Sequence, residues 1–158
     1  YNPENQGSAL ALEETRRWAR SLSIVVEPYG MGGPHDLDEV FSGITRSHPD
    51  AMMTTADPLI AAYRGRTVAL AAKQRLISMY PGKEYLEVGG LVFYGGSIPE
   101  MYRGVAVYVD RIRKGAKASE LPVEQPTKFD TVINARAAKA LGLTIPAAVL
   151  LRADQVLE

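Results

Sequence analysis

The stretch AMMTTADP, residues 51–58, decides the fold class. Its first five residues, 51–55, form a short and mostly apolar run of the length that a buried strand requires. Asp57 is a favourable helix N-cap, and Pro58 suits the first turn of a helix because its fixed φ is already helical. The stretch therefore predicts a strand that feeds directly into a helix, and this helix should extend to about Arg75.

Strand-like and helix-like patterns alternate outward from this stretch in both directions. Further strands are expected at residues 23–27, 76–80, 91–94 and 127–133, and further helices at residues 7–22, 36–44, 82–88, 97–115, 134–142 and 146–158. Alternation with short links is typical of an α/β fold in which helices flank a parallel sheet on both faces. We therefore expect that fold class.

Capping signals support several of the expected helix starts. Asp36 is followed three residues later by Glu39, and Ser97 is followed three residues later by Glu100. Each pair has the spacing of a capping box, in which two side chains satisfy backbone N–H groups reciprocally. Asn134 is a further favourable N-cap.

Composition excludes several classes of function. The chain has 158 residues, of which 18 are basic and 18 acidic, so its net charge is zero and no nucleic-acid partner is expected. It has no cysteine, which excludes disulfides and thiolate chemistry. No serine elbow, phosphate loop or metal-ligand spacing is present. We therefore expect no enzyme, no catalytic residue, no cofactor and no metal site.

The expected sheet places a group of polar and aromatic residues at one edge. In open α/β sheets, ligands bind outside the carboxyl ends of the strands. That rule selects the loops at residues 2–8, 27–33, 54–57, 80–84 and 94–97. Our candidate ligand-binding residues from these loops are Asn2, Asn5, Ser8, Thr55, Asp57, Tyr80, Glu84 and Tyr94.

Most of these candidate residues have two interpretations, one as a ligand contact and one as a structural residue. Asn2, Asn5 and Ser8 precede a helix, where they either hold a ligand carboxylate at the positive helix end or simply cap it. Asp57 either binds a ligand amine or serves only as an N-cap, and the two roles are compatible.

The aromatic and acidic candidates at the strand ends also have two readings. Tyr80 and Tyr94 either stack on a ligand or are half-buried rim tyrosines. Glu84 either pairs with a cation or is a first-turn glutamate that the helix dipole favours. Tyrosines together with helix N-termini suit a small ligand that has an anionic group and an apolar body.

Several motifs, which together span nearly the whole chain, resemble one known family. They are YNPEN at 1–5, YPGKEY at 80–85, GGL at 89–91, YG at 94–95, YVDRI at 108–112, KGAK at 114–117, LPVEQPTKF at 121–129 and ALGLTIP at 140–146. They resemble the ABC-transporter substrate-binding family that contains the tryptophan-binding protein of some Gram-positive bacteria. The GMGGP stretch within residues 29–35 departs from the plainer link that the resemblance leads us to expect.

The resemblance implies a type I periplasmic binding protein, in which two α/β lobes close on a ligand. Residues 1–96 would then form a ligand-binding lobe that lacks its first strand, and residues 97–158 a hinge crossing and a C-terminal return segment. The other lobe and a secretion signal would lie upstream. The location would be periplasmic or otherwise extracytoplasmic, and the partners a small amino-acid-like or carboxylate ligand and the membrane subunits of an ABC permease. A homodimer of this chain is also expected where its strand edges are exposed.

Two other functions fit the same fold class. The lobe could belong to the ligand-sensing domain of a regulator or receptor, because related lobes occur there. A flavodoxin-like enzyme domain is the third hypothesis, although the absence of a phosphate loop argues against it.

Overall fold

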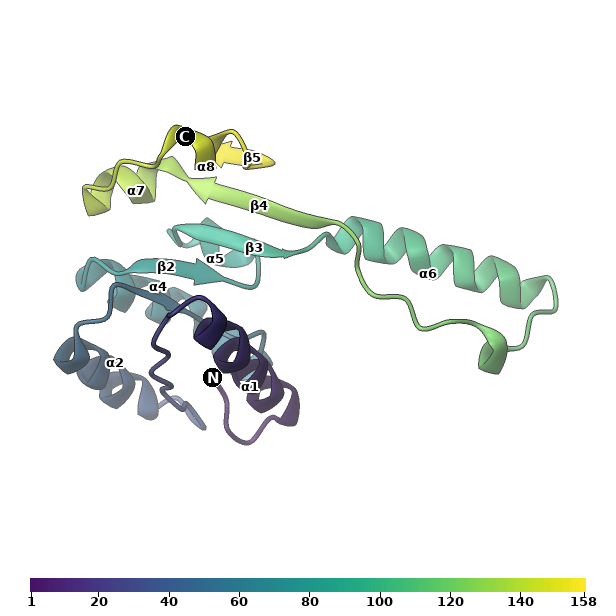
Figure 1. The fold of residues 1–158 in the computed structure, drawn as a ribbon, viewed down its shortest axis with the longest axis horizontal. Coiled ribbons are helices and arrows are strands. Elements are labelled where there is room, and N and C mark those ends of the chain that lie inside the picture. The colour runs from purple at the N-terminus through teal and green to yellow at the C-terminus, as the bar shows by residue number, and fades with distance from the viewer.

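A five-stranded sheet organises the molecule, and the computed structural model describes all residues, 1–158 (Figure 1). The strands lie in the order β1-β2-β3-β4-β5 and comprise β1 Ala51–Met53, β2 Ile77–Tyr80, β3 Val92–Gly96, β4 Phe129–Asn134 and β5 Gln155–Leu157. Neighbouring strands are parallel except β3 and β4, which are antiparallel. The carboxyl ends of β1, β2 and β3 therefore meet at one edge.

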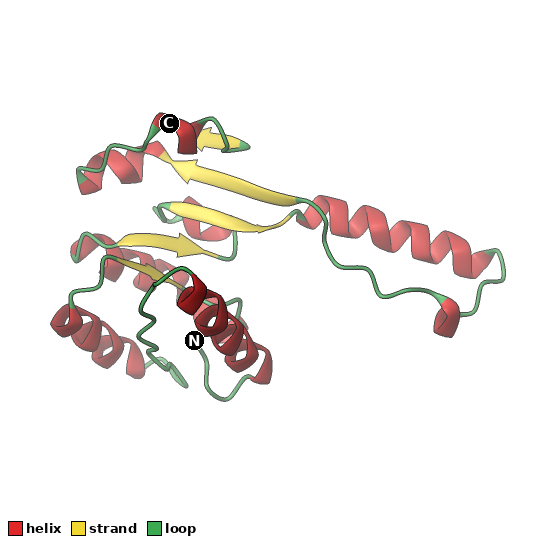
Figure 2. Ribbon diagram, viewed as in Figure 1, coloured by secondary structure: helices red, strands yellow, loops and turns green.

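Helices lie on both faces of this sheet (Figure 2). They are α1 Gln6–Ser21, α2 Asp36–Ser47, α3 Pro58–Ala62, α4 Arg64–Lys73, α5 Glu84–Glu87, α6 Ile98–Arg113, the 3₁₀ helix η1 Ala118–Glu120, α7 Ala135–Leu141 and α8 Ala147–Leu150. In Figure 1, α1 lies in front of the sheet and α4 and α5 lie behind it. The predicted α/β class is confirmed.

Two apolar clusters form the core between the sheet and the helices behind it. The first contains the buried stripe of α2, with Leu37, Phe41 and Ile44 packed near α4. The second surrounds Tyr80 and Tyr85 below β2 and β3. Full burial of one such side chain contributes about 1.5–3 kcal/mol, so these clusters hold the helices against the sheet.

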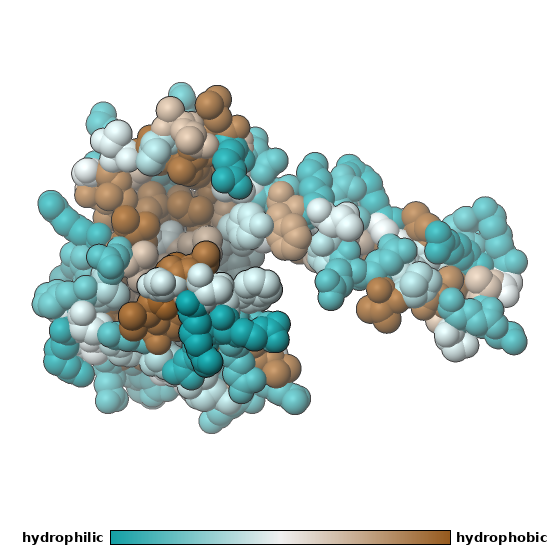
Figure 3. All heavy atoms as spheres, in the orientation of Figure 1, coloured by the Kyte–Doolittle hydropathy of each residue, from teal (hydrophilic) through white to brown (hydrophobic).

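One segment leaves the sheet altogether. Helix α6 and the connector after it project as an arm between β3 and β4 (Figure 1), and no residue of α6 is buried. At the base of the arm, the backbone of Gly96 lies close to Pro126 and Met101. Figure 3 shows a hollow between this arm and the α/β lobe. The hollow lies on the side toward which β2 and β3 point.

Two predicted elements are wrong. Residues 23–27 form no strand: they run without a strand neighbour, and the N–H of Ile24 bonds only to the carbonyl of Ala19 at the end of α1. The predicted helix at residues 146–158 stops after α8. The reason is Asp154, whose carboxylate and backbone N–H both pair with the backbone of Thr131, which starts β5 along β4.

Local capping also differs from the prediction. The carboxylate of Asp36 accepts hydrogen bonds from the N–H groups of Gly32 and Gly33, so it orders the glycine-rich loop and does not form a capping box with Glu39. The side chain of Ser97 makes no cap bond in α6. The predicted helix at residues 57–75 is interrupted at Tyr63, where the backbone leaves helical geometry, and becomes α3 and α4.

Candidate functional site

The start of α1 is joined to the loop after β1 by a chain of polar contacts. The hydroxyl of Ser8 lies 2.6 Å from that of Thr55 and accepts a 2.9 Å hydrogen bond from the N–H of Asn2. Ser8 is only 1% exposed, whereas Asn2 and Thr55 are partly exposed. Ser8 therefore holds the backbone at the start of α1 in place. Its two hydrogen-bond partners, Asn2 and Thr55, present polar groups at the surface.

A second contact ties the same helix to α3. Asn5 caps α1, because its side-chain oxygen accepts from the N–H of Gly7 at 2.9 Å, and its amide nitrogen donates to the carboxylate of Asp57 at 2.7 Å. Asp57 in turn caps α3 through the N–H groups of Leu59 and Ile60, at 2.9 and 3.2 Å. The predicted capping by Asn5 and Asp57 is confirmed.

Asp57 is a buried carboxylate with several donors. Burial by itself raises its pKa, but hydrogen bonds from Asn5, from the backbone of Ile60 and from Asn2 outweigh that effect, so the pKa lies below its ordinary value. The carboxylate is therefore charged at neutral pH and already satisfied within the protein. Its amine-binding role remains a prediction, and its place in the structure is that of a brace between α1 and α3.

Tyr80 lies in the core and not at the rim. It is 1% exposed, and its ring stacks on that of Tyr85 at a centroid distance of 4.8 Å and an interplanar angle of 13°. Burial raises the pKa of both hydroxyls, that of Tyr85 to about 12. Since one ring face is covered and the side chain is enclosed, Tyr80 offers no ring surface for stacking in this conformation.

Glu84 and Tyr94 remain open to solvent at the same edge. Glu84 begins α5, and its carboxylate folds back over Gly82. Tyr94 on β3 is 50% exposed, and one face of its ring stacks on Phe129 at a centroid distance of 5.6 Å. The other face of the Tyr94 ring is the aromatic surface that this edge presents.

Sequence reasoning missed an ion pair between the loop after β2 and the start of β4. The Lys83 amine lies 2.9 Å from the carboxylate of Asp130 and 5.6 Å from the centre of the Phe93 ring. The hydrogen bond from Lys83 is the main reason that the pKa of Asp130 lies below its ordinary value, and Ser97 adds a further bond. The partners are 47 residues apart, so no local spacing indicates the pair.

The structure thus unites five candidates and separates three. Asn2, Asn5, Ser8, Thr55 and Asp57 form the polar network at the start of α1, whereas Tyr80 is buried and Glu84 and Tyr94 stand on other elements of the same edge. No group of three or more histidine, aspartate or glutamate side chains is placed to hold a metal ion.

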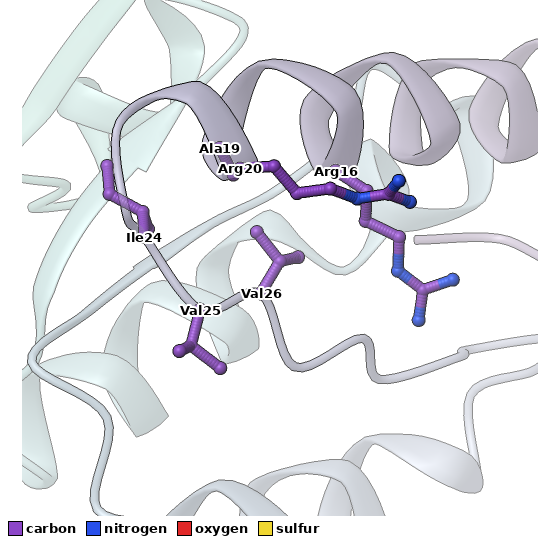
Figure 4. A pocket seen from close by; sticks show the side chains of 6 residues that line it. All are labelled: Arg16, Ala19, Arg20, Ile24, Val25 and Val26. Carbon is purple, nitrogen blue, oxygen red and sulfur yellow. The ribbon is translucent and has the colours of Figure 1, made fainter.

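Two surface cavities lie away from the candidate residues. Two shallow cavities, of about 270 and 380 Å³, lie under α1 and between α2 and α4, and neither is lined by a candidate residue (Figure 4 shows the first).

Residues 1–157 match the family model described as ABC transporter substrate binding protein. The chain belongs to this substrate-binding protein family. A comparison with curated protein sequences finds no match. The substrate-binding chain contains no helix that is long and apolar enough to cross a membrane.

Solved structures support the family assignment. Two of them share 25% sequence identity and a TM-score of 0.87 with this substrate-binding chain: a conserved domain protein from Vibrio cholerae and an ABC domain in complex with L-Trp from Streptococcus pneumoniae. Each match covers 99% of this chain but only 52% and 53%, respectively, of the chain in the solved structure. A ligand-free, open substrate-binding protein from Clostridium difficile, at 18% identity and a TM-score of 0.76, shares the fold. The chain therefore spans about half the length of these structures.

Proposed function

We propose that this chain is one lobe of a solute-binding protein that serves ABC import and holds a small amino-acid-like or carboxylate ligand between two lobes. The observation that carries this proposal is the polar network that joins the start of α1 to the loop after β1, next to the carboxyl end of that strand. The structurally similar ABC domain from Streptococcus pneumoniae has been solved with L-Trp, which supports an amino-acid ligand.

The network divides into residues that a ligand can reach and residues that hold them. Asn2, Asn5 and Thr55 are partly exposed and supply amide and hydroxyl groups near the N-terminus of a 16-residue helix. Ser8 and Asp57 are buried and brace these groups. Neutral donors at the positive end of a helix favour an anionic group, so a ligand carboxylate fits this place.

The aromatic part of the edge suits the remainder of such a ligand. The free face of Tyr94 gives an apolar surface, and Glu84 gives an exposed carboxylate that can pair with an amine. An α-amino acid with an apolar or aromatic side chain carries the three matching groups.

The arm and the return segment complete the proposal. Residues 1–96 would act as the ligand-binding lobe, and residues 97–158 would include the hinge crossing, because α6 leaves the sheet at the end of β3 and β4 re-enters it. Closure of a second lobe over the edge would trap the ligand. A membrane permease would then recognise the closed form on the extracytoplasmic side of the membrane.

A ligand screen on the two-lobed protein tests this function. Standard L-amino acids and small carboxylates would be added singly, and the thermal midpoint would be measured as a function of ligand concentration. The proposal expects at least one amino acid to raise the midpoint in a saturable way, and the D-enantiomer serves as the matched control. Shifts with nucleotides or flavin alone would instead support a flavodoxin-like enzyme domain.

A transport assay separates an importer from a sensor. The protein would be added to vesicles that contain the permease encoded with it, and ATP hydrolysis would be measured with and without the amino acid that binds. Ligand-dependent stimulation supports import. Binding without any stimulation or uptake would favour the ligand-sensing domain of a regulator or receptor.

A further inference from the structure

We propose that Lys83 and Asp130 are positioning residues that form a latch at the base of the arm: their ion pair sets the direction in which α6 leaves the lobe, and it holds the loop that carries Glu84. The first part of this inference concerns the arm alone. The second part, that ligand affinity depends on the latch, rests on the proposed function.

The carboxylate of Asp130 lies where the arm joins the sheet. Asp130 pairs with Gly95 in the antiparallel ladder of β3 and β4. Just beyond this ladder, the N–H of Ser97 donates to the carbonyl of Lys128 at 3.0 Å, and the side chain of Ser97 bonds to the Asp130 carboxylate. Ser97 is the N-cap residue of α6. A carboxylate on the strand that re-enters the lobe therefore holds the start of the helix that leaves it (Figure 1).

The buried carboxylate of Asp130 has Lys83 as its main partner. Asp130 is 8% exposed, and a buried charge without a partner strongly destabilises a protein. The Lys83 ammonium lies 2.9 Å from it, whereas Ser97 and Lys128 act on it more weakly. Loss of the Lys83 charge would therefore leave the base of the arm with the weaker partners alone.

The loop that supplies Lys83 packs directly on β3. A Cβ at Gly95 would lie 2.9 Å from the ring of Phe93 and 3.2 Å from the carbonyl oxygen of Pro81. The missing side chain at Gly95 thus allows the loop to approach the strand closely. The Lys83 ammonium also lies 5.6 Å from the centre of the Phe93 ring, which adds a cation–π contact. The loop after β2 is therefore joined to both strands from which the arm extends.

Aromatic rings fix the opposite face of the same two strands. Successive side chains of a strand point to opposite faces, so Tyr94 and Phe129 lie on the other side from Phe93 and Asp130. The rings of Tyr94 and Phe129 stack at a centroid distance of 5.6 Å, but both side chains are about half exposed. A charge-assisted hydrogen bond constrains geometry more than such a stack does. We therefore expect the ion pair to set the direction of the arm.

The latch also decides which charge the loop presents. Lys83 and Glu84 follow each other and carry opposite charges. The ammonium is directed to Asp130, whereas the carboxylate of Glu84 folds over Gly82 and stays exposed. Loss of Asp130 would free the ammonium to neutralise Glu84, the residue that we propose as the partner of a ligand amine. Loss of Lys83 would free the loop from β4, so ligand affinity should fall in both cases.

Distances between two spin labels test the arm without any ligand. This chain has no cysteine, so Glu13→Cys on α1 and Arg113→Cys at the end of α6 give one labelling site on the lobe and one on the arm. Both side chains are exposed. In the ligand-free two-lobed protein, Lys83→Met should broaden the distribution of label distances. Lys83→Arg keeps the charge and should restore the narrow distribution.

The ion pair of Arg66 and Asp38 provides the matched control. It also joins two separate elements, α2 and α4, and the Arg66 side chain is 48% exposed, against 51% for Lys83. Arg66→Met should therefore leave the label distances unchanged. Thermal unfolding of each variant shows that it is folded, and the half-exposed position of Lys83 makes Lys83→Met the safer change than one at the buried Asp130.

Calorimetric titration with a panel of standard L-amino acids, including L-tryptophan, tests the second part. Lys83→Met and Asp130→Asn should each weaken the binding of any amino acid that the unaltered protein binds by about 5-fold. Lys83→Arg and Arg66→Met should leave that affinity unchanged.

Three results would overturn the inference in whole or in part. Label distances that Lys83→Met leaves unchanged, or that Arg66→Met broadens equally, would show that no latch exists. A broadened distribution with unchanged affinity would remove the link to the ligand loop and leave the proposed function intact. If no amino acid bound the unaltered protein, the proposed function and the second part would fail together, and the label distances would still decide the first part.

Discussion

The side-chain amide of Asn5 donates a 2.7 Å hydrogen bond to the carboxylate of Asp57, 52 residues further along the chain. Each partner also caps its own helix, Asn5 at α1 and Asp57 at α3. Two helix N-termini on different elements are therefore held in one fixed arrangement, and the polar groups of Asn2 and Thr55 that we propose as ligand contacts lie beside it.

Replacement of Asp57 should weaken the fold more than loss of an ordinary cap. Asp57→Ala removes the cap of α3, typically about 1 kcal/mol, and leaves the amide of Asn5 without its partner, which adds about 1–2 kcal/mol. Equilibrium unfolding in urea measures the difference. Asp110→Ala, on the exposed face of α6, is the control and should change stability by less than about 0.5 kcal/mol. Equal effects of the two substitutions would contradict the bracing role of Asp57.

Stability should fall as the solution becomes acidic. The pKa values of Asp57 and Asp130 lie below their ordinary value in the folded protein, so the folded state binds protons less readily than the unfolded chain. Their contribution to the free energy of unfolding is fully present above the pKa of about 3.9 in the unfolded chain, and it is lost as pH falls through the lower pKa of the folded protein. Unfolding in urea from pH 6 to pH 3 measures this slope. Asp130→Asn should flatten it, and an unchanged slope would exclude Asp130 as a source.

The ion pair of Lys83 and Asp130 should couple the loop after β2 to β4. A double-mutant cycle with Lys83→Met and Asp130→Asn should give a coupling free energy of about 1 kcal/mol. We expect a small coupling free energy because the Lys83 side chain is 51% exposed and solvent screens its charge. The exposed pair of Lys114 and Asp110 gives the matched cycle and should couple more weakly. A coupling no larger than that of the control pair would show that burial of Asp130 adds nothing.

Two glycines should respond to alanine in opposite directions. A Cβ at Gly90 would lie 2.7 Å from the carbonyl oxygen of Tyr85 and 3.0 Å from the ring of Tyr80, so Gly90→Ala should destabilise by about 1–3 kcal/mol. Gly104, within α6, has open space at the same position. Gly104→Ala should stabilise by about 0.5–1 kcal/mol, because glycine disfavours helix. Thermal unfolding of both variants is the measurement, and a neutral Gly90→Ala would contradict the close packing.

Tyr94 should contribute directly to ligand affinity. If its free ring face stacks on the ligand, Tyr94→Ala in the two-lobed protein should weaken binding by about 1–3 kcal/mol. Titration calorimetry with the amino acid found in the screen measures the change. Leu151→Ala, at an exposed position beyond α8, is the control and should leave affinity unchanged. Affinity that survives Tyr94→Ala would remove Tyr94 from the site.

Local signals predicted much of the fold and part of the site. The apolar run at residues 51–55 and the cap at Asp57 led to β1 and α3, and Asn134 and Gly142 delimit α7 as expected. The predicted strand at residues 23–27 failed, since a strand needs a partner in space and local pattern does not supply one. The predicted rim position of Tyr80 is wrong for a related reason: a position at a strand end does not tell which face of the sheet a side chain takes.

The sequence by itself determined the α/β class, the family and the caps of α1, α3 and α7, because these depend on residue type and short spacing. Only the tertiary structure decided that Asn5 meets Asp57, that Lys83 pairs with Asp130 and that Tyr80 is buried against Tyr85. These contacts join residues on separate elements or depend on which face of the sheet the core covers. Their formation follows from the packing of the whole lobe, which no local pattern encodes.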